Sequence, residues 1–275
     1  MPELPEVETV RRTLMPAIGA RIASVWDSGK PLHMKRRPPR RKLQALVGAT
    51  LTGVRRHGKY LLVDTDRPES LLVHLGMTGR LCIHPKGEPR ATHTHLVLDL
   101  GTNELRFADP RRFGQLDVYR REEERAHPAL AALGPDALVH GVDPAALLEI
   151  ARRRQRTTLK AFLLDQSVIA GVGNIYASEA LWRAGLRPTT RARRLTAERA
   201  RRLADAVREV IASSLENGGT TLSDFVAADG AEGHNADFLW VYDREGEPCA
   251  RCKGLIRRSV LQGRATYFCP TCQAP

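Results

Sequence analysis

The second and third residues of this chain could do covalent chemistry. Removal of Met1 would leave Pro2 with a free secondary amine beside the carboxyl group of Glu3. A secondary amine that attacks an aldehyde-like carbon forms an iminium ion, an electron sink that works like a lysine Schiff base. The structural alternative is that Pro5 occupies the first turn of a helix and Pro2 merely precedes it.

Two further segments carry polar groups that a structural strand does not need. Lys59 leads into an apolar run that starts at Tyr60, and the turn at residues 109–114 presents two guanidinium groups and the Phe113 ring. An aromatic ring can wedge into a base stack and an arginine can bind an exposed base edge, so this turn suits duplex DNA. The alternative makes Phe113 a core residue and pairs Asp109 with an arginine.

Four of the five cysteines form two pairs near the end of the chain, with two residues inside each pair and sixteen between them: Cys249, Cys252, Cys269 and Cys272. This spacing places four thiolates around one tetrahedral Zn²⁺ ion. Residues 256–268 predict a β-hairpin, and the metal ion would hold its open end together. Two disulfides are the alternative, which an intracellular context opposes. We expect one structural zinc ion that supplies this segment's folding energy, and no redox or nucleotide cofactor.

The chain is strongly basic. Its 275 residues carry a formal net charge of +12, and residues 151–208 alone hold fourteen Lys/Arg and four Asp/Glu, a net of +10. This excess favours a polyanion, either nucleic acid or an anionic membrane, and its concentration in one region favours a surface that faces phosphates. No apolar run is long enough to span a bilayer and no apolar signal segment follows the start, so we expect a cytoplasmic protein.

A turn with two glycines lies inside this basic region, at residues 171–177. Glycines let the backbone approach a phosphate, a helix start aims its amides at the anion, and Asn174 can add a side-chain donor. A plain connection between helices is the alternative. The preceding basic side chains favour phosphate binding: Arg152, Arg153, Arg154, Arg156 and Lys160.

The hydrophobic pattern predicts different architectures in the two parts of the chain. A helical period at residues 4–14 is followed by short β-type runs that predict a β-sandwich. These runs are residues 24–26, 50–55, 60–64, 71–75, 96–100, 104–107 and 116–119. Cys82 stands in another strand-like stretch and is expected in the core, whereas residues 35–42 are expected to form a loop.

From Pro128 onward the pattern becomes helical. Asp143-Pro144 opens one helix, and Thr196 caps another that Gly218-Gly219 ends. We expect an α+β multidomain protein. Its predicted parts are an N-terminal β-sandwich with an N-terminal helix (1–125), a linker (126–135), a helical DNA-binding domain (136–240) and a zinc finger (241–275).

Several motifs, in order and from end to end of the chain, resemble the bacterial formamidopyrimidine-DNA glycosylases, which repair oxidised purines. They are residues 1–12, 59–62, 74–79, 109–114 and 171–177 and the four-cysteine finger. The sister family, endonuclease VIII, acts on oxidised pyrimidines and shares the Pro-Glu start and a finger. It usually begins Pro-Glu-Gly-Pro-Glu and lacks the turn at residues 109–114, so Leu4 and that turn favour the purine branch.

The resemblance implies a β-sandwich, a helix-two-turns-helix domain with a β-hairpin zinc finger, and DNA bound between them with the damaged nucleotide extruded. It implies that Pro2 attacks C1′ and releases the base, that Glu3 acts as general acid on the sugar ring, and that Lys59 assists as acid/base. β-Elimination on the 3′ side of the sugar and then δ-elimination on the 5′ side follow. Arg264 stands where the family places the acid for the δ-elimination.

The resemblance also assigns DNA contacts. Met77, Arg111 and Phe113 match the residues that fill the void and wedge the stack, with Arg111 facing the orphaned cytosine. Phosphate or other DNA contacts are matched by His93, Asn174 and Arg264.

The chain departs from the family pattern in two places. In the base-recognition loop, which matches residues 227–240, Ala231 and His234 stand where some members have a basic and an aromatic residue. Gln155 stands at a position that can be a DNA-contacting lysine, and Arg154 and Arg156 are its expected substitutes.

Two other classes of protein fit part of this pattern. A non-catalytic zinc-finger DNA-binding protein explains the charge and the finger but gives no reason for Pro2, Glu3 or Lys59. A zinc-containing RNA-binding module is opposed by the wedge-like turn. We therefore expect a monomeric bacterial base-excision-repair glycosylase and AP lyase. Its expected partner is duplex DNA with 8-oxoguanine or a formamidopyrimidine opposite cytosine, and its expected place is the nucleoid.

Overall fold

The structure is a computed structural model that describes residues 1–32, 38–221 and 225–273. The chain forms two compact units. The first comprises Met1–Ala131 together with Asn217–Ala236, and the second comprises Ala132–Glu216 together with Asp237–Pro275. In the described part of the chain, no helix is long and apolar enough to cross a membrane.

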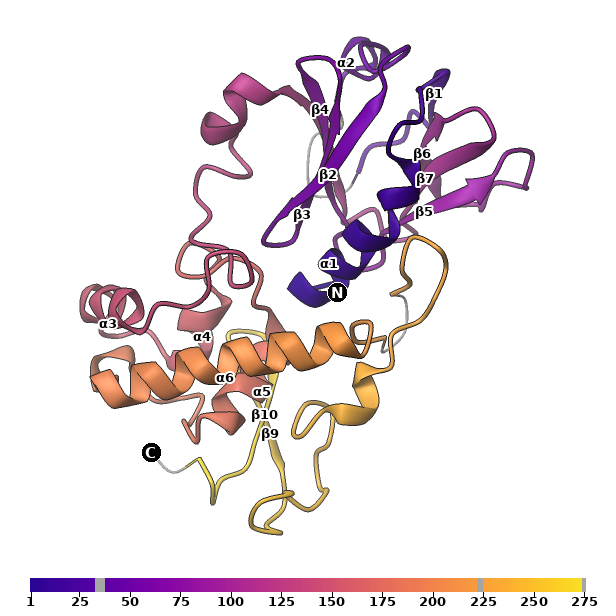
Figure 1. The fold of residues 1–275 in the computed structure, drawn as a ribbon. Helices are drawn as coiled ribbons and strands as arrows, with labels where there is room; N and C mark the ends of the chain where they lie inside the picture. The colour runs from indigo at the N-terminus through magenta and orange to yellow at the C-terminus, as the bar shows by residue number, and fades with distance from the viewer. Residues whose placement is uncertain (33–37, 222–224, 274–275) are drawn as a thin grey trace. The chain divides into compact units, whose positions relative to one another are not determined.

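The first unit is a β-sandwich of two four-stranded antiparallel sheets (Figure 1). One sheet has the order β1-β6-β7-β5 and the other has the order β2-β3-β4-β8. The strands are β1 (Ser24–Asp27), β2 (Leu51–His57), β3 (Tyr60–Thr65), β4 (Glu69–His74), β5 (Arg80–Pro85), β6 (Thr94–Asp99), β7 (Asn103–Ala108) and β8 (Gln115–Arg120). The sandwich confirms the expected architecture, since apolar residues of both sheets share one buried core.

Helix α1 (Leu4–Thr13) lies against β2 and β3 and shares the sandwich core. Val7 and Val10, spaced at nearly one helical turn, are fully buried there, as the apolar period predicts. Short helices complete this unit: η1 (Met15–Ala17), α2 (Arg40–Gln44), η2 (Arg121–Ala126) and η4 (Asn235–Phe238), the last of which runs on into the second unit.

The second unit is helical, with a small hairpin near its C-terminal end. Its elements are α3 (Pro144–Arg153), α4 (Leu159–Leu164), α5 (Asn174–Arg183), η3 (Ala192–Arg194), α6 (Ala197–Glu216), β9 (Arg257–Leu261) and β10 (Arg264–Phe268). Asp143 caps α3 by accepting the Ala145 amide at 2.9 Å, and Thr196 accepts the Arg199 amide before α6. The hairpin turns at Gln262 and Gly263, both with positive φ, as a tight turn requires.

Strand β5 carries Cys82, which is buried, as the strand-like stretch around this residue predicts. Two other local features differ from expectation. Part of the loop expected at residues 35–42 lies outside the described residues, and from Arg40 the chain is helical instead. The described residues of the segment 217–236, which were expected in the helical domain, pack with the β-sandwich, where the Ala228 carbonyl accepts the Ile83 amide at 2.8 Å.

Candidate functional site

Pro2 and Glu3 lie at the N-terminal end of α1, and both are buried, with Glu3 only 1% exposed. The Glu6 carboxylate holds this segment, because it accepts the backbone N–H of Glu3 and that of Thr220, each at 2.8 Å. A Cβ on Gly219 would come within 3.3 Å of Glu6, and the φ of Gly219 is +89°. Glu6 was not among the candidate residues, although a glutamate three residues after a helix cap is a known capping signal.

Lys59 lies in the two-residue turn between β2 and β3, directly after Gly58, and is 7% exposed. The Arg56 guanidinium shapes this turn by donating to the Gly58 carbonyl at 3.0 Å and to the Glu8 carboxylate at 3.1 Å. Glu8 is on α1, so buried hydrogen bonds connect the helix that begins after Glu3 to the residue that precedes Lys59.

The Glu8 carboxylate is held in its charged form. Burial by itself would raise its pKa, but hydrogen bonds from Arg11, Arg12 and Arg56 outweigh burial and lower the pKa of Glu8 below its ordinary value. This pairing compensates the charge of Arg56, whose side chain is almost fully buried.

The turn at residues 109–114 is fixed by the buried carboxylate of Asp109. This carboxylate accepts the Thr78 hydroxyl at 2.6 Å and the Gly114 amide at 2.7 Å. A Cβ on Gly76 would lie 2.5 Å from the backbone of Phe113 and Gly114. The turn is therefore locked against residues 76–79, which carry Met77.

The contacts of this turn differ from the structural alternative, which made Phe113 a core residue and paired Asp109 with an arginine. Asp109 bonds Thr78 and the Gly114 amide, and Phe113 is half-buried with the Arg111 guanidinium 4.7 Å from its ring centroid. Arg111 and Met77 are exposed, and so is His93, whose carbonyl accepts the Asp109 amide at 2.9 Å. One locked surface of the first unit thus holds all four residues expected to meet DNA there.

The second unit corrects the expectation for Lys160. This side chain is 1% exposed, and its Nζ donates to the Asn174 carbonyl at 2.9 Å and to the Ser178 hydroxyl at 2.5 Å. Lys160 therefore braces the start of α5 from inside the fold and does not present its charge to a phosphate. Its place in a basic run predicted exposure, because lysine is rarely fully buried unless its charge is paired or hydrogen-bonded.

Asn174, the first residue of α5, bonds within the protein. Its side-chain amide donates to the Ala265 carbonyl at 2.9 Å, while its Oδ1 is buried without a hydrogen-bond partner among the described residues. Ala265 follows Arg264, which is exposed at the start of β10. The structure thus brings Asn174 beside the backbone of the strand that carries Arg264.

Arg154 and Arg156 differ in their availability to a ligand. Arg154 pairs with Asp165 and donates to the Ser167 hydroxyl at 2.9 Å, so its guanidinium is partly used within the fold. Arg156 has an exposed side chain. Of the two, Arg156 is the better expected substitute for a lysine at Gln155.

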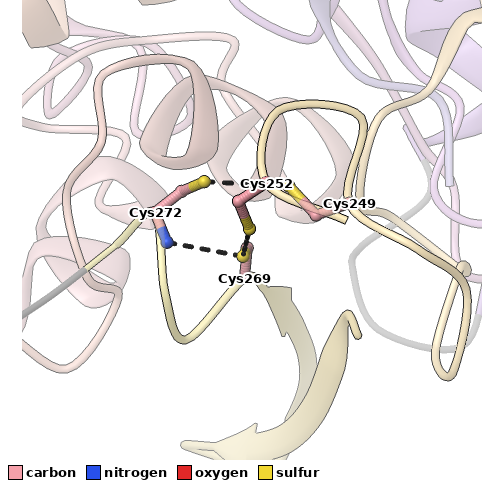
Figure 2. A group of neighbouring side chains, drawn as sticks. All are labelled: Cys249, Cys252, Cys269 and Cys272. Atoms are coloured by element: carbon pink, nitrogen blue, oxygen red, sulfur yellow. Dashed lines mark hydrogen bonds between the residues drawn. The ribbon is translucent and has the colours of Figure 1, made fainter. Parts of the chain in front are cut away.

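The four cysteines of the finger converge as predicted (Figure 2). Their sulfur atoms all lie within 4.8 Å of one another, with Cys249 and Cys272 sulfurs 3.9 Å apart and Cys252 and Cys269 sulfurs 3.4 Å apart. A tetrahedral Zn²⁺ with Zn–S bonds of about 2.3 Å separates its sulfurs by about 3.8 Å, so this donor set fits one structural zinc ion.

The surroundings of Cys249 favour its thiolate form. Burial alone would raise its pKa, but hydrogen bonds from the Cys252 backbone, the Trp182 indole and the Arg251 backbone outweigh burial and lower the pKa of Cys249 to about 6. A thiol must lose its proton to bind zinc, and these donors favour the thiolate.

Comparison with known families agrees with this architecture. Residues 1–116 match the formamidopyrimidine-DNA glycosylase N-terminal domain, residues 133–226 match the H2TH domain of the same enzymes, and residues 246–275 match a zinc finger found in FPG and IleRS. A β-sandwich joined to such a helical domain and finger defines a zinc-finger DNA glycosylase of base-excision repair.

Full-length relatives identify the family. The formamidopyrimidine-DNA glycosylases of Methylococcus capsulatus and Xanthomonas campestris are 47% and 46% identical to this chain, over 99% of it and 100% of their own length. The chain belongs to the formamidopyrimidine-DNA glycosylase family.

Solved structures with the same fold contain damaged DNA. A variant of the Lactococcus lactis FPG in complex with Fapy-dG DNA has a TM-score of 0.92 and 31% identity, with both chains covered completely. The Lactococcus lactis enzyme with abasic-site DNA has a TM-score of 0.91 and 32% identity, covering 99% of this chain and 100% of that one.

Proposed function

We propose that this protein removes oxidised purines from duplex DNA through a Schiff base on Pro2 and then cleaves the DNA strand as an AP lyase. Membership of the formamidopyrimidine-DNA glycosylase family supports the class of reaction. The buried Pro2–Glu3 start, connected through Glu8 and Arg56 to the turn that contains Lys59, supports the assignment of residues.

In the first step, the amine of Pro2, freed by removal of Met1, attacks C1′ of the extruded nucleotide. The bond between C1′ and the base breaks, and the base leaves with the bonding electron pair and gains a proton. Glu3 protonates the ring oxygen, the sugar opens, and the amine loses its proton to leave an iminium ion between the Pro2 nitrogen and C1′. The Glu6 carboxylate supports this step because it holds the backbone of Glu3.

In the second step, the iminium ion acts as an electron sink. A proton leaves C2′ and the 3′ phosphate departs from C3′ in β-elimination. A second proton then leaves C4′ and the 5′ phosphate departs from C5′ in δ-elimination. Lys59 is the proposed acid/base near the opened sugar, and Arg264 is the proposed acid of the second elimination. Hydrolysis of the iminium ion then frees Pro2 and leaves a one-nucleoside gap.

The proposed DNA contacts are made by exposed or half-buried side chains and by the backbone at the start of α5. Met77, Arg111 and Phe113 would fill the space left by the extruded nucleotide, with Arg111 facing cytosine. His93, Arg156 and Arg264 would contact DNA on the two units, and Asn174 would contribute through the amides of its helix start. This activity would take place at the bacterial nucleoid.

Borohydride trapping tests the proposal. Reduction of the iminium ion should link the protein covalently to DNA that carries 8-oxoguanine or a formamidopyrimidine opposite cytosine, with Pro2 as the attached residue. A non-catalytic zinc-finger protein would bind such DNA without an adduct. Preferential trapping on oxidised pyrimidines would instead assign the chain's activity to the substrates of the sister family. The range of substrates is open to test, because one solved Lactococcus lactis complex contains an oxidised pyrimidine.

A further inference from the structure

The indole of Trp182 makes a hydrogen bond to one of the zinc-binding cysteines. Its Nε1 lies 3.4 Å from the sulfur of Cys249, and both residues are buried in the small core of the finger, at 3% and 0% exposure. An N–H donor that meets a metal-bound thiolate withdraws electron density from the sulfur and fixes its orientation.

Two neighbours hold the indole ring in this position. The Trp240 ring stacks on it at a centroid distance of 5.4 Å and an interplanar angle of 17°. The Arg251 guanidinium lies 4.1 Å from the ring centroid and also donates to the carbonyls of Trp182 and Arg183 at 2.9 Å. Arg251 stands between Cys249 and Cys252 in the sequence, so the first cysteine pair of the finger contacts the C-terminal end of α5 through Arg251.

Helix α5 therefore meets the finger at both of its ends. At its start, the Asn174 amide donates to the Ala265 carbonyl of β10, and near its end Trp182 donates to Cys249. Between them, the Glu179 carboxylate accepts the backbone N–H groups of Trp240, Val241 and Tyr242 at 2.8–2.9 Å. The helix that begins at the expected phosphate-binding turn is thus the support on which the metal-binding hairpin is aligned.

We propose that Trp182 is a positioning residue of the zinc centre. Its indole N–H donates to the Cys249 thiolate, so that metal loading secures the finger on α5 and keeps the strand of Arg264 beside Asn174. Trp240 and Arg251 clamp the ring but do not reach the sulfur with a donor from their side chains. The proposal concerns the metal centre alone and does not depend on the chemistry of Pro2.

The first test is the absorption spectrum of the Co²⁺-substituted protein, in which cobalt replaces zinc in the same donor set. Trp182→Phe retains an aromatic ring for stacking but loses the donor. Its sulfur-to-cobalt charge-transfer band should move to longer wavelength, because the sulfur regains electron density. Trp240→Phe, the matched control, changes the stack without removing the bond and should leave the band in place. An identical band in Trp182→Phe and the unmodified protein overturns the proposal.

Zinc release and solvent exchange complete the test. Transfer of zinc to a chelator should be roughly tenfold faster for Trp182→Phe than for Trp240→Phe, since a hydrogen bond to a charged acceptor is lost. In the unmodified zinc-loaded protein, the indole N–H of Trp182 should exchange slowly with solvent, and zinc removal should make it exchange fast. This exchange measurement decides the question even if Trp182→Phe does not fold. Fast exchange of that N–H in the zinc-loaded protein would falsify the inference.

Discussion

The Arg56 guanidinium donates a hydrogen bond to the Gly58 carbonyl at 3.0 Å, one residue before Lys59. The same guanidinium reaches Glu8 on α1, the helix whose first turn follows Pro2 and Glu3. The candidate nucleophile and the candidate acid/base are 57 residues apart in the sequence. The Glu8–Arg56 pair connects the elements that carry them through buried contacts.

Disruption of this pair should impair strand cleavage through Lys59. In Glu8→Gln, Arg56 loses a charged partner and the turn that contains Lys59 loosens, so we expect β,δ-elimination from a preformed abasic site to slow by roughly 10- to 100-fold. Single-turnover gel assays measure this rate.

Glu104→Gln is the matched control for that change. Glu104 is also a buried carboxylate of the first unit, but it pairs with Arg106 at 2.7 Å and with Arg90 at 3.3 Å. This variant should keep the elimination rate. Equal slowing in both variants would mean that general destabilisation, and not the placement of Lys59, is the cause.

The stability of the protein should depend on pH through Glu8. Its folded-state pKa is lowered, so its contribution to stability is present above its ordinary pKa of 4.5 and is lost as the pH falls through the folded-state value. Urea unfolding between about pH 6 and about pH 3 should show a shallower acid loss of stability for Glu8→Gln than for the unmodified protein. Parallel curves would show that Glu8 does not carry this dependence.

The assignments of Pro2 and Glu3 predict three losses of activity with different causes. Pro2→Gly should bind lesion DNA but lose most base excision, since a primary amine replaces a pre-organised secondary one. A form that retains Met1 should give no borohydride adduct, because the Pro2 nitrogen is then an amide. Glu3→Gln should fold and bind but lose base excision. Full trapping by the form with Met1, verified by intact mass, would remove Pro2 from the mechanism.

Removal of zinc should weaken DNA binding without touching a catalytic group at Pro2. Metal analysis should find one Zn²⁺ per chain. Cys269→Ser should release the metal and disorder the hairpin, so that Arg264 no longer keeps its place beside Asn174 and affinity for lesion DNA falls. Active protein that contains no zinc would contradict this prediction.

Arg111 should set the preference for the opposite base. Its guanidinium donors suit the O2 and N3 acceptors of cytosine, whereas adenine presents an amino donor beside N1, a difference worth roughly 1–3 kcal/mol. Excision opposite cytosine should therefore be on the order of 10- to 100-fold faster than opposite adenine. Arg111→Ala should flatten the ratio, and Phe113→Ala should lower both rates. A preference that survives in Arg111→Ala would assign the discrimination elsewhere.

The sequence by itself determined the features that depend on local spacing. Two cysteine pairs, each with two residues between its members, predicted the zinc centre, and short β-type runs separated by turn residues predicted the β-sandwich. Both patterns act over a few residues. The helix caps at Asp143 and Thr196 could also be predicted, because a cap depends on residues within the first turn of its helix. The motif order identified the family on which the site assignments depend.

Only the tertiary structure decided which polar side chains are buried and which groups they form hydrogen bonds with. Lys160 was expected on a phosphate and is buried against Asn174, because a charge in a basic run can still find partners inside the fold. The Glu8–Arg56 pair and the Trp182–Cys249 bond join residues 48 and 67 positions apart, and no local pattern encodes them. The described residues of the segment 217–236 pack with the β-sandwich and not with the helical unit that precedes them in the sequence. Burial of apolar surface stabilises such contacts regardless of the distance along the chain.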